Sequence, residues 1–298
     1  MSIAIILPYF GKLPNYFNLF LYSCSKNKKV TFIVITDQTI KKTYDNIIII
    51  NKTLSDLEAE AQKKICKKCK IKSPYKLCDY KPMYGILFKE LLKGYDYWGF
   101  CDCDLIFGDL SEIAKIANTG KYEKILDEGH LQLYKNNEKV NNLYKNKAFP
   151  AMSYKSVIRK SSACFFDELS FNYICKKKAI KTYSNKYLYA DILPQYSDFN
   201  TPRDNIKNQV FKYSCGKLKR VNDDREFIYI HLQKRKMSVS CARTDNYYIK
   251  PNSFSDNAII EAARKQDDYN KKRIARVFKN PVAIIIKMHS ILIKQLLK

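Results

Sequence analysis

Two aspartates at the end of an apolar stretch are the residues of this chain best suited to bind a metal ion. The stretch begins at Tyr95, is aromatic and apolar up to Asp102, and continues to Asp104 two residues later. In an extended segment this spacing puts both carboxylates on one face, about 7 Å apart. Like charges at the end of a buried strand repel each other and are costly to desolvate, and a divalent cation removes both costs. The pattern predicts an Asp-x-Asp site at which Mg²⁺ or Mn²⁺ holds a diphosphate.

A second group of charged residues lies just upstream of this stretch. Lys76, Asp79 and Lys81 fall in the segment 73–85, which leads into a predicted helix over 84–92 and then into the apolar strand. A diphosphate needs cationic donors as well as a metal, and the two lysines could supply them. A solvated lysine-rich loop is the alternative interpretation of the same segment.

The elements that must position these side chains follow an alternating order. Continuous apolar runs at 2–7, 29–35 and 46–50 are typical of strands covered on both faces, and a helix is expected over 15–26 with Asn15 as its cap. This order predicts an α/β fold with a mixed, mostly parallel sheet flanked by helices. In such sheets ligands bind beyond the carboxyl ends of the strands. The turns expected at that edge, beside the two aspartates, contain Pro8, Tyr9, Phe10, Thr36 and Asp37.

The later part of the chain adds further candidates. A strand over 226–232 carries His231, and the segment after 162–166 carries Asp167 and Glu168, an acidic pair in a basic chain. A lone histidine after an apolar strand is often structural, and the acidic pair could simply begin a helix. The other elements expected here are helices over 54–70 and 111–117 and strands over 129–134 and 187–192.

The composition limits the class of protein. The chain has 298 residues, 46% of them hydrophobic and 13% aromatic, which excludes a disordered protein. A formal net charge of +25 favours a polyanionic partner such as nucleic acid or a membrane surface, although an AT-rich genome would also enrich lysine. Without a secretory signal or a long apolar run, the expected location is the cytoplasm, with reduced thiols. The Cys66–Cys69 spacing is zinc-like but lacks a second close pair.

The C-terminal residues differ from the rest. We expect one domain over 1–250 and a basic helical tail over 251–298, with helices near 255–278 and 281–298. Basic residues recur along one side of this tail beside apolar ones, a division that suits the anionic inner-membrane surface and predicts a peripheral location on its cytoplasmic face. A helix docked on the domain with a solvated basic face is the alternative. The basic residues are Arg276, Lys287, Lys294 and Lys298.

Five segments, taken together, resemble a known family. The most specific is Trp98-Gly-Phe-Cys-Asp-Cys-Asp-Leu-Ile-Phe-Gly108, and the others are 6–15, 75–82, 129–134 and 229–237. In this order they resemble bacterial glycosyltransferases of the GT-A fold, the group found in capsule and lipopolysaccharide biosynthesis. The resemblance covers roughly residues 2–240 and does not include the tail.

The resemblance implies transfer of a sugar from a nucleotide-sugar donor, a UDP-sugar before a GDP-sugar, to a hydroxyl of a surface-glycan or lipid-linked acceptor. Asp102 and Asp104 match the motif that holds Mn²⁺ or Mg²⁺, the diphosphate and the ribose, and His231 matches a late metal ligand. The turns at 8–10 and 36–37 would face the base and ribose, and Lys76, Asp79 and Lys81 would complete the donor pocket. An inverting reaction would need a base, with Asp167 and Glu168 preferred over Glu128; a retaining reaction would need none.

Two other functions compete with this one. A nucleic-acid- or membrane-binding protein without catalysis would explain the charge. However, the chain has no nucleic-acid-binding motif, and a protein that binds polyanions does not need paired aspartates. An inactive scaffold in a polysaccharide assembly is the third interpretation. The aspartate pair favours the enzyme and predicts no nucleic-acid partner.

Overall fold

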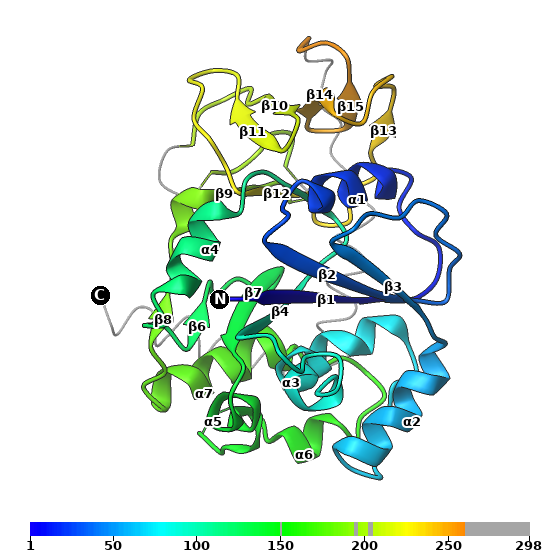
Figure 1. Ribbon diagram of the computed structural model, residues 1–298, viewed down its shortest axis with the longest axis vertical. Coiled ribbons are helices and arrows are strands. Elements are labelled where there is room, and N and C mark those ends of the chain that lie inside the picture. The colour runs from blue at the N-terminus through cyan, green and yellow to red at the C-terminus, as the bar shows by residue number, and fades with distance from the viewer. Residues whose placement is uncertain (150, 194–195, 202–204, 260–298) are drawn as a thin grey trace.

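The computed structural model describes residues 1–149, 151–193, 196–201 and 205–259, which form an α/β fold with helices on both faces of its largest sheet (Figure 1). The strand order of this sheet is β3-β2-β1-β4-β7-β6-β8. The first four strands are parallel, whereas β7 is antiparallel to both of its neighbours. The strands are β1 (Ile3–Tyr9), β2 (Val30–Thr36), β3 (Ile47–Asn51), β4 (Tyr97–Cys101), β6 (Lys124–Ile125), β7 (Leu131–Lys135) and β8 (Thr182–Tyr183).

Two smaller sheets complete the fold. One has the order β5-β12-β9, and the other has the order β11-β10-β14-β15-β13. Short connections join β10 to β11 and β14 to β15, and such connections permit only antiparallel pairing. The sheets are therefore mixed, and the expectation of a mostly parallel sheet is wrong for the molecule as a whole. These strands are β5 (Leu105–Phe107), β9 (Tyr189–Asp191), β10 (Phe211–Ser214), β11 (Lys217–Arg220), β12 (Tyr229–His231), β13 (Ser238–Val239), β14 (Asn246–Lys250) and β15 (Ser253–Ser255).

The central strand β1 is apolar on both sides because helices cover both faces of the sheet. Ile3, Ile5 and Leu7 belong to one core cluster with helices α1 (Phe17–Ser25) and α4 (Ser111–Asn118). Ala4 and Ile6 belong to the opposite cluster with α2 (Leu54–Lys64), α3 (Tyr84–Leu87) and α7 (Phe171–Lys177). The strand extends through Pro8, beyond the predicted end at residue 7. A proline is tolerated there because pairing with β4 ends at Ile6.

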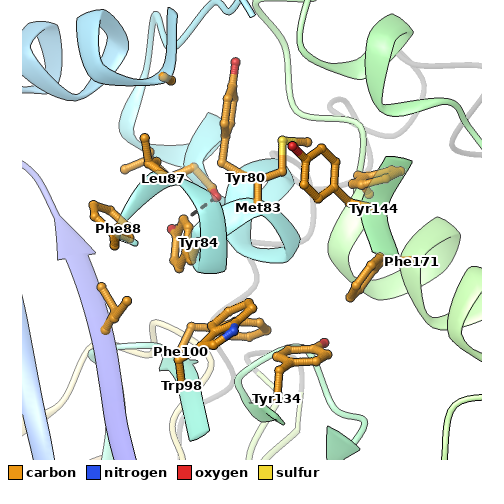
Figure 2. Packing of buried hydrophobic residues seen from close by; sticks show 14 of the residues in the cluster. Tyr80, Met83, Tyr84, Leu87, Phe88, Trp98, Phe100, Tyr134, Tyr144 and Phe171 are labelled. Atoms are coloured by element: carbon orange, nitrogen blue, oxygen red, sulfur yellow. Dashed lines mark hydrogen bonds between the residues drawn. The ribbon is translucent and has the colours of Figure 1, made fainter. Parts of the chain in front are cut away.

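A layer of aromatic side chains supports the sheet beneath the Asp-x-Asp segment. Figure 2 shows Tyr84, on the side of α3, facing Trp98 and Phe100 of β4 and Tyr134 of β7. The rings of Trp98 and Tyr134 stack with centroids 4.9 Å apart, and that of Tyr84 meets Phe100 edge-on at 6.4 Å. Such pairs add stability beyond the area that they bury, so this layer provides a firm base for the end of β4.

Several helices differ from their predicted bounds. Asn15 does not cap α1; its side chain donates to the Met237 carbonyl, and the helix begins at Phe17. Helix α2 ends at Lys64 rather than 70; farther along the chain, the Tyr80 hydroxyl and the Glu58 carboxylate accept the N–H groups of Lys70 and Ile71. Helix α3 covers only Tyr84–Leu87 of the predicted 84–92, and turns follow it over 88–94. The remaining segments are η1 (Pro74–Met83), α5 (Glu138–Asn141), η2 (Leu143–Lys145), α6 (Tyr154–Val157), the π-helical turn η3 (Phe166–Ser170) and η4 (Lys186–Leu188).

The predicted tail falls mostly outside the described residues, which end at 259. Strand β15 lies beyond residue 250 and pairs with β13 and β14, so the sheet continues past the expected domain boundary. The basic stripe and both tail helices beyond residue 259 are not among the described residues. In the described part of the chain, every helix is too short or too polar to cross a membrane.

Candidate metal centre

Asp102 and Asp104 lie in a tight turn between two sheets. Strand β4 ends at Cys101 and β5 begins at Leu105, so the aspartates are not on one extended strand as the spacing suggested. The turn still brings their carboxylates together, and the Asp102 backbone N–H donates to the His130 carbonyl at 3.0 Å. The Asp102 side chain is 30% exposed, whereas Asp104 is buried. The pair can therefore present oxygen atoms to a ligand from one side.

His231 joins this pair from a segment about 130 residues later. Strand β12 runs antiparallel to β5 and places His231 opposite Leu105. The Nε2 atom of His231 is 3.6 Å from Oδ1 of Asp104. One ligand atom from each of Asp102, Asp104 and His231 lies within 4.8 Å of the others. The structure thus brings together the three residues that the sequence predicted as metal ligands.

The donor atoms of this group fit a divalent cation. Oδ1 of Asp104 is buried and has no hydrogen-bond partner, a costly state for a carboxylate oxygen. Two carboxylates and an imidazole form a ligand set suited to Mn²⁺ and related ions, and a cation would satisfy the unpaired oxygen. Among the described residues, the groups with metal-binding geometry contain only Asp and His, and neither includes Cys66 or Cys69.

Two residues of the centre were missed by the sequence analysis. Oδ1 of Asp191, at the end of β9, lies 3.3 Å from Nδ1 of His231. The ring of His130 stacks on that of His231 with centroids 4.1 Å apart. Together they form a second group of possible ligands that shares His231. With Nδ1 facing Asp191, Nε2 of His231 is turned toward Asp104, the orientation that a metal ligand at Asp104 requires.

The carboxylates of the centre are balanced by lysines. Nζ of Lys81 is 2.9 Å from Oδ1 of Asp102 and donates to the Gly129 carbonyl at 2.8 Å. Burial by itself raises the pKa of Asp102, but Lys81, Lys234 and His231 outweigh it and lower that pKa. Burial opposes the charge of Lys81 too, and Asp102 outweighs it to raise the pKa of Lys81 well above its usual value. Asp102 is therefore ionised and ready to bind a cation.

The segment after β12 is shaped to close the site. Gln233 and Lys234 both adopt positive φ, 51° and 56°, which is uncommon for such residues. This bend brings the backbone N–H of Lys234 to Oδ2 of Asp104. Burial opposes the charge of Lys234, but Asp102 and other neighbours raise its pKa above the usual range. Two successive residues with positive φ are therefore held in place at the candidate centre.

A cavity of about 880 Å³ opens over this centre. Both aspartates, His231, Lys81 and Lys234 line it, together with residues from η1, η3, α7 and β8. Its volume is within the range of small-molecule sites. The other predicted site residues divide into those in this cavity and those outside it.

Three candidate bases line the cavity. Asp167 is buried, with Oδ2 3.6 Å from Nζ of Lys81, and burial raises its pKa well above the usual value. Glu168 is exposed and lies against Gly129, where a Cβ would come within 2.5 Å of its carboxylate oxygen. Glu128 forms an ion pair with Lys186 at 3.2 Å. Glu168 is thus the candidate carboxylate most open to a ligand.

Lys76 and Asp79 lie outside the cavity, contrary to their expected place in a donor pocket. Both side chains are fully buried and form an ion pair at 2.7 Å. Nζ of Lys76 also donates to the Val157 and Ser162 carbonyls, and the Asp79 carboxylate accepts from the backbone of residues 164 and 166. The pair therefore fastens η1 to the segment before η3, and these contacts leave it no exposed surface for a ligand.

The turns after β1 and β2 share the sheet edge with the aspartates but do not line the cavity. Asp37 is exposed, accepts from the Gly11 backbone at 3.0 Å, and so joins the two turns. Phe10 and Thr36 are buried, Phe10 in the core. Pro8 and Tyr9 are partly exposed; burial, and then the nearby Cys103, raise the pKa of Tyr9 to about 12. The turns thus form a neighbouring surface rather than part of the cavity.

Comparisons with known proteins identify a family but no activity. No curated protein matches the chain. The profile of a family of unknown function, DUF6625, matches residues 5–258. This match spans most of the chain and includes the whole candidate centre, so the protein belongs to this family of unknown function.

Proposed function

We propose that the protein is a metal-dependent glycosyltransferase that moves a sugar from a nucleotide-sugar donor to an acceptor hydroxyl, with the GT-A fold that its sequence motifs resemble. The observation that carries the proposal is the convergence of Asp102, Asp104 and His231 at the floor of the cavity. Two lysines lie beside the candidate metal centre, and a diphosphate is bound best by a metal ion together with ammonium groups.

The arrangement of the large sheet supports a nucleotide ligand. The order β3-β2-β1-β4 is that of dinucleotide-binding folds, whose ligands bind outside the carboxyl ends of the strands where the strand order reverses. Here that point lies between β1 and β4. Tyr9 ends β1, and Asp102 follows β4 directly. A nucleotide could lie over the turns at 8–10 and 36–37 with its diphosphate at the aspartates.

The mechanism follows from the charges around the centre. Bound Mn²⁺ or Mg²⁺ would supply electrostatic stabilisation of a departing diphosphate. Asp102, Asp104 and His231 would hold the ion, and Asp191 would fix the His231 ring through Nδ1. The ammonium groups of Lys234 and Lys81, which both line the cavity, would face the negative charge that develops on the leaving group.

The acceptor hydroxyl must lose a proton if the reaction inverts configuration. Glu168 is the better placed of the two preferred carboxylates because it is exposed in the cavity. Asp167 is buried and paired with Lys81, so it is less open to an acceptor hydroxyl. We assign Glu168 the role of base and Asp167 a role in holding Lys81.

A donor panel tests the proposal. Hydrolysis or transfer is measured with UDP- and GDP-sugars, with Mn²⁺ and after chelation. Asp104→Ala should lower the metal-dependent rate at least about 100-fold, because the variant loses a metal ligand. Asp109→Ala, which alters an exposed aspartate outside the cavity, is the matched control and should retain the rate. Full activity in Asp104→Ala would reject the metal assignment.

A further inference from the structure

Phe165 has a backbone conformation that a phenylalanine seldom adopts. Its φ and ψ are 56° and 40°, in the left-handed region, and it immediately precedes the turn that carries Asp167. The Cβ atom makes this region unfavourable for a bulky residue, so surrounding contacts must enforce it. Phe165 is only partly buried and lines the cavity. A phenylalanine ring therefore lines the cavity at a position whose backbone conformation would suit a glycine better.

The contacts that enforce this conformation are buried and charged. The Asp79 carboxylate accepts from the backbone N–H of Cys164 at 2.8 Å and from that of Phe166 at 2.9 Å. These residues flank Phe165 on both sides, and Asp79 is itself held by Lys76. The lysine–aspartate pair thus fixes the bend that directs Phe165 away from the core. Strain held in this way is typical of ligand-binding positions.

A second aromatic ring meets Phe165 at the cavity wall. The centroids of Tyr75 and Phe165 are 6.4 Å apart, and the ring planes are inclined by 78°. Nζ of Lys234 lies 4.6 Å from the Tyr75 centroid, and Lys234 also contacts Asp104 through its backbone N–H. The two rings form an aromatic corner, which we define as Tyr75 and Phe165, and Lys234 links this corner to the candidate metal centre.

We propose that the aromatic corner binds the sugar ring of a glycosyl diphosphate, with the phosphates toward Lys234 and the metal centre. The C–H face of a pyranose is apolar and slightly positive, and it is attracted to the negative face of an aromatic ring. A phosphate attached to that ring would reach the ammonium beside Tyr75. This inference rests on the proposed function and adds the position of the donor sugar to it.

The test compares each sugar nucleotide with its parent diphosphate. The full chain is titrated calorimetrically in Mn²⁺ with UDP, UDP-glucose, UDP-galactose, UDP-N-acetylglucosamine, GDP and GDP-mannose. At least one sugar nucleotide should bind roughly three- to tenfold more tightly than its parent, the range expected for one aromatic contact. We call this ratio of affinities the margin. Phe165→Gly should remove this margin and leave the affinity for the parent diphosphate unchanged.

Control variants separate ring loss from unfolding. Glycine adopts positive φ without strain, which offsets part of the loss of a partly buried ring, so Phe165→Gly should still unfold cooperatively within a few degrees of the wild type. Phe165→Tyr keeps a ring and should keep the margin. Phe149→Gly removes a ring that is 89% exposed and outside the cavity, and it too should keep the margin.

The outcomes distinguish this inference from the proposed function. A margin that survives in Phe165→Gly, or that is absent from the wild type, overturns the aromatic corner while metal-dependent diphosphate binding still supports the enzyme. Equal weakening of UDP and UDP-glucose in Phe165→Gly also overturns it, because the ring would then hold the base. Absence of any nucleotide binding to the wild type rejects both proposals.

Discussion

His231 is the residue through which pH should control metal binding. Burial alone lowers the pKa of His231, but Asp104 and Asp191 outweigh it and raise the pKa to about 9. The imidazole is therefore protonated at neutral pH, and a metal can bind only after the proton leaves. We expect the affinity for Mn²⁺ to rise about tenfold per pH unit between roughly pH 6.5 and 8.5, below the raised pKa. Calorimetry in buffers of different ionisation enthalpy would measure both this slope and the released proton.

Two variants test the cause of this slope. His231→Gln should bind Mn²⁺ more weakly and with little dependence on pH in the same range. Asp191→Asn should keep the contact with the His231 ring but lose a negative charge, which lowers the pKa of His231. The pH above which the Mn²⁺ affinity stops rising should therefore be lower in this variant. A wild-type affinity that does not change with pH would contradict the assignment of His231 as a ligand.

The sequence predicted part of this centre because some of its residues have a local pattern. Asp102 and Asp104 are recognisable from their spacing after an apolar strand, whereas His231 was predicted as a ligand only from the resemblance to a family that places a late metal ligand there. Asp191 and His130 carry no such pattern, and they meet His231 only because β9 pairs with β12 and β7 pairs with β4. Contacts of this kind depend on strand pairing, which the sequence did not specify.

At the scale of elements, the Lys76–Asp79 pair should stabilise the junction between η1 and η3. Asp79→Ala would leave a buried ammonium without its partner and two backbone N–H groups without an acceptor. Removal of one member of a buried ion pair costs about 3–5 kcal/mol. We expect a loss of that size in the free energy of unfolding, measured by urea denaturation.

A surface ion pair provides the matched control for this variant. Lys72 contacts Glu58 at 2.6 Å, but its side chain is 63% exposed. Lys72→Ala should therefore cost less than about 1 kcal/mol, because solvent screens the pair. If Asp79→Ala were no more costly than Lys72→Ala, the proposed role of the buried pair in holding Phe165 would be lost.

Elements with apolar sequences were predicted more accurately than those with mixed sequences. The strands expected at 29–35 and 46–50 are observed at Val30–Thr36 and Ile47–Asn51. The first is buried along almost its whole length, as a continuous apolar run predicts, whereas the second is an edge strand whose Ile48 is 44% exposed. The 3-10 helix Pro74–Met83 was not predicted, because its polar and aromatic residues have no clear helical period. Its function in the fold comes from distant partners of Lys76 and Asp79. These two residues were assigned to the donor pocket because they lie just upstream of the Asp-x-Asp strand, and the sequence gives no sign of the distant backbone groups that bind them.

At the scale of the molecule, the candidate centre lies where two sheets meet. Asp102 and Asp104 form the turn from β4 of the large sheet to β5, and His231 ends β12 of the smaller sheet. Segments separated by more than 100 residues are therefore joined at one point. The chain has a net charge of +25, but three carboxylates, those of Asp102, Asp104 and Asp191, lie together at this point. A local acidic group in a basic chain is what a cation site beside an anionic substrate requires.

Because the centre connects two sheets, bound metal should stabilise the whole described fold against unfolding. A ligand that binds only the folded state adds about 2.7 kcal/mol at a concentration 100 times its dissociation constant. Mn²⁺ should therefore raise the urea midpoint of the wild type in a concentration-dependent way, and chelation should reverse the effect. Asp104→Ala removes one of the proposed ligands, so whatever its stability without metal it should gain little from Mn²⁺. Equal stabilisation of both proteins would mean that Mn²⁺ binds elsewhere, so the response to metal, rather than the starting stability, decides whether these three ligands form the site.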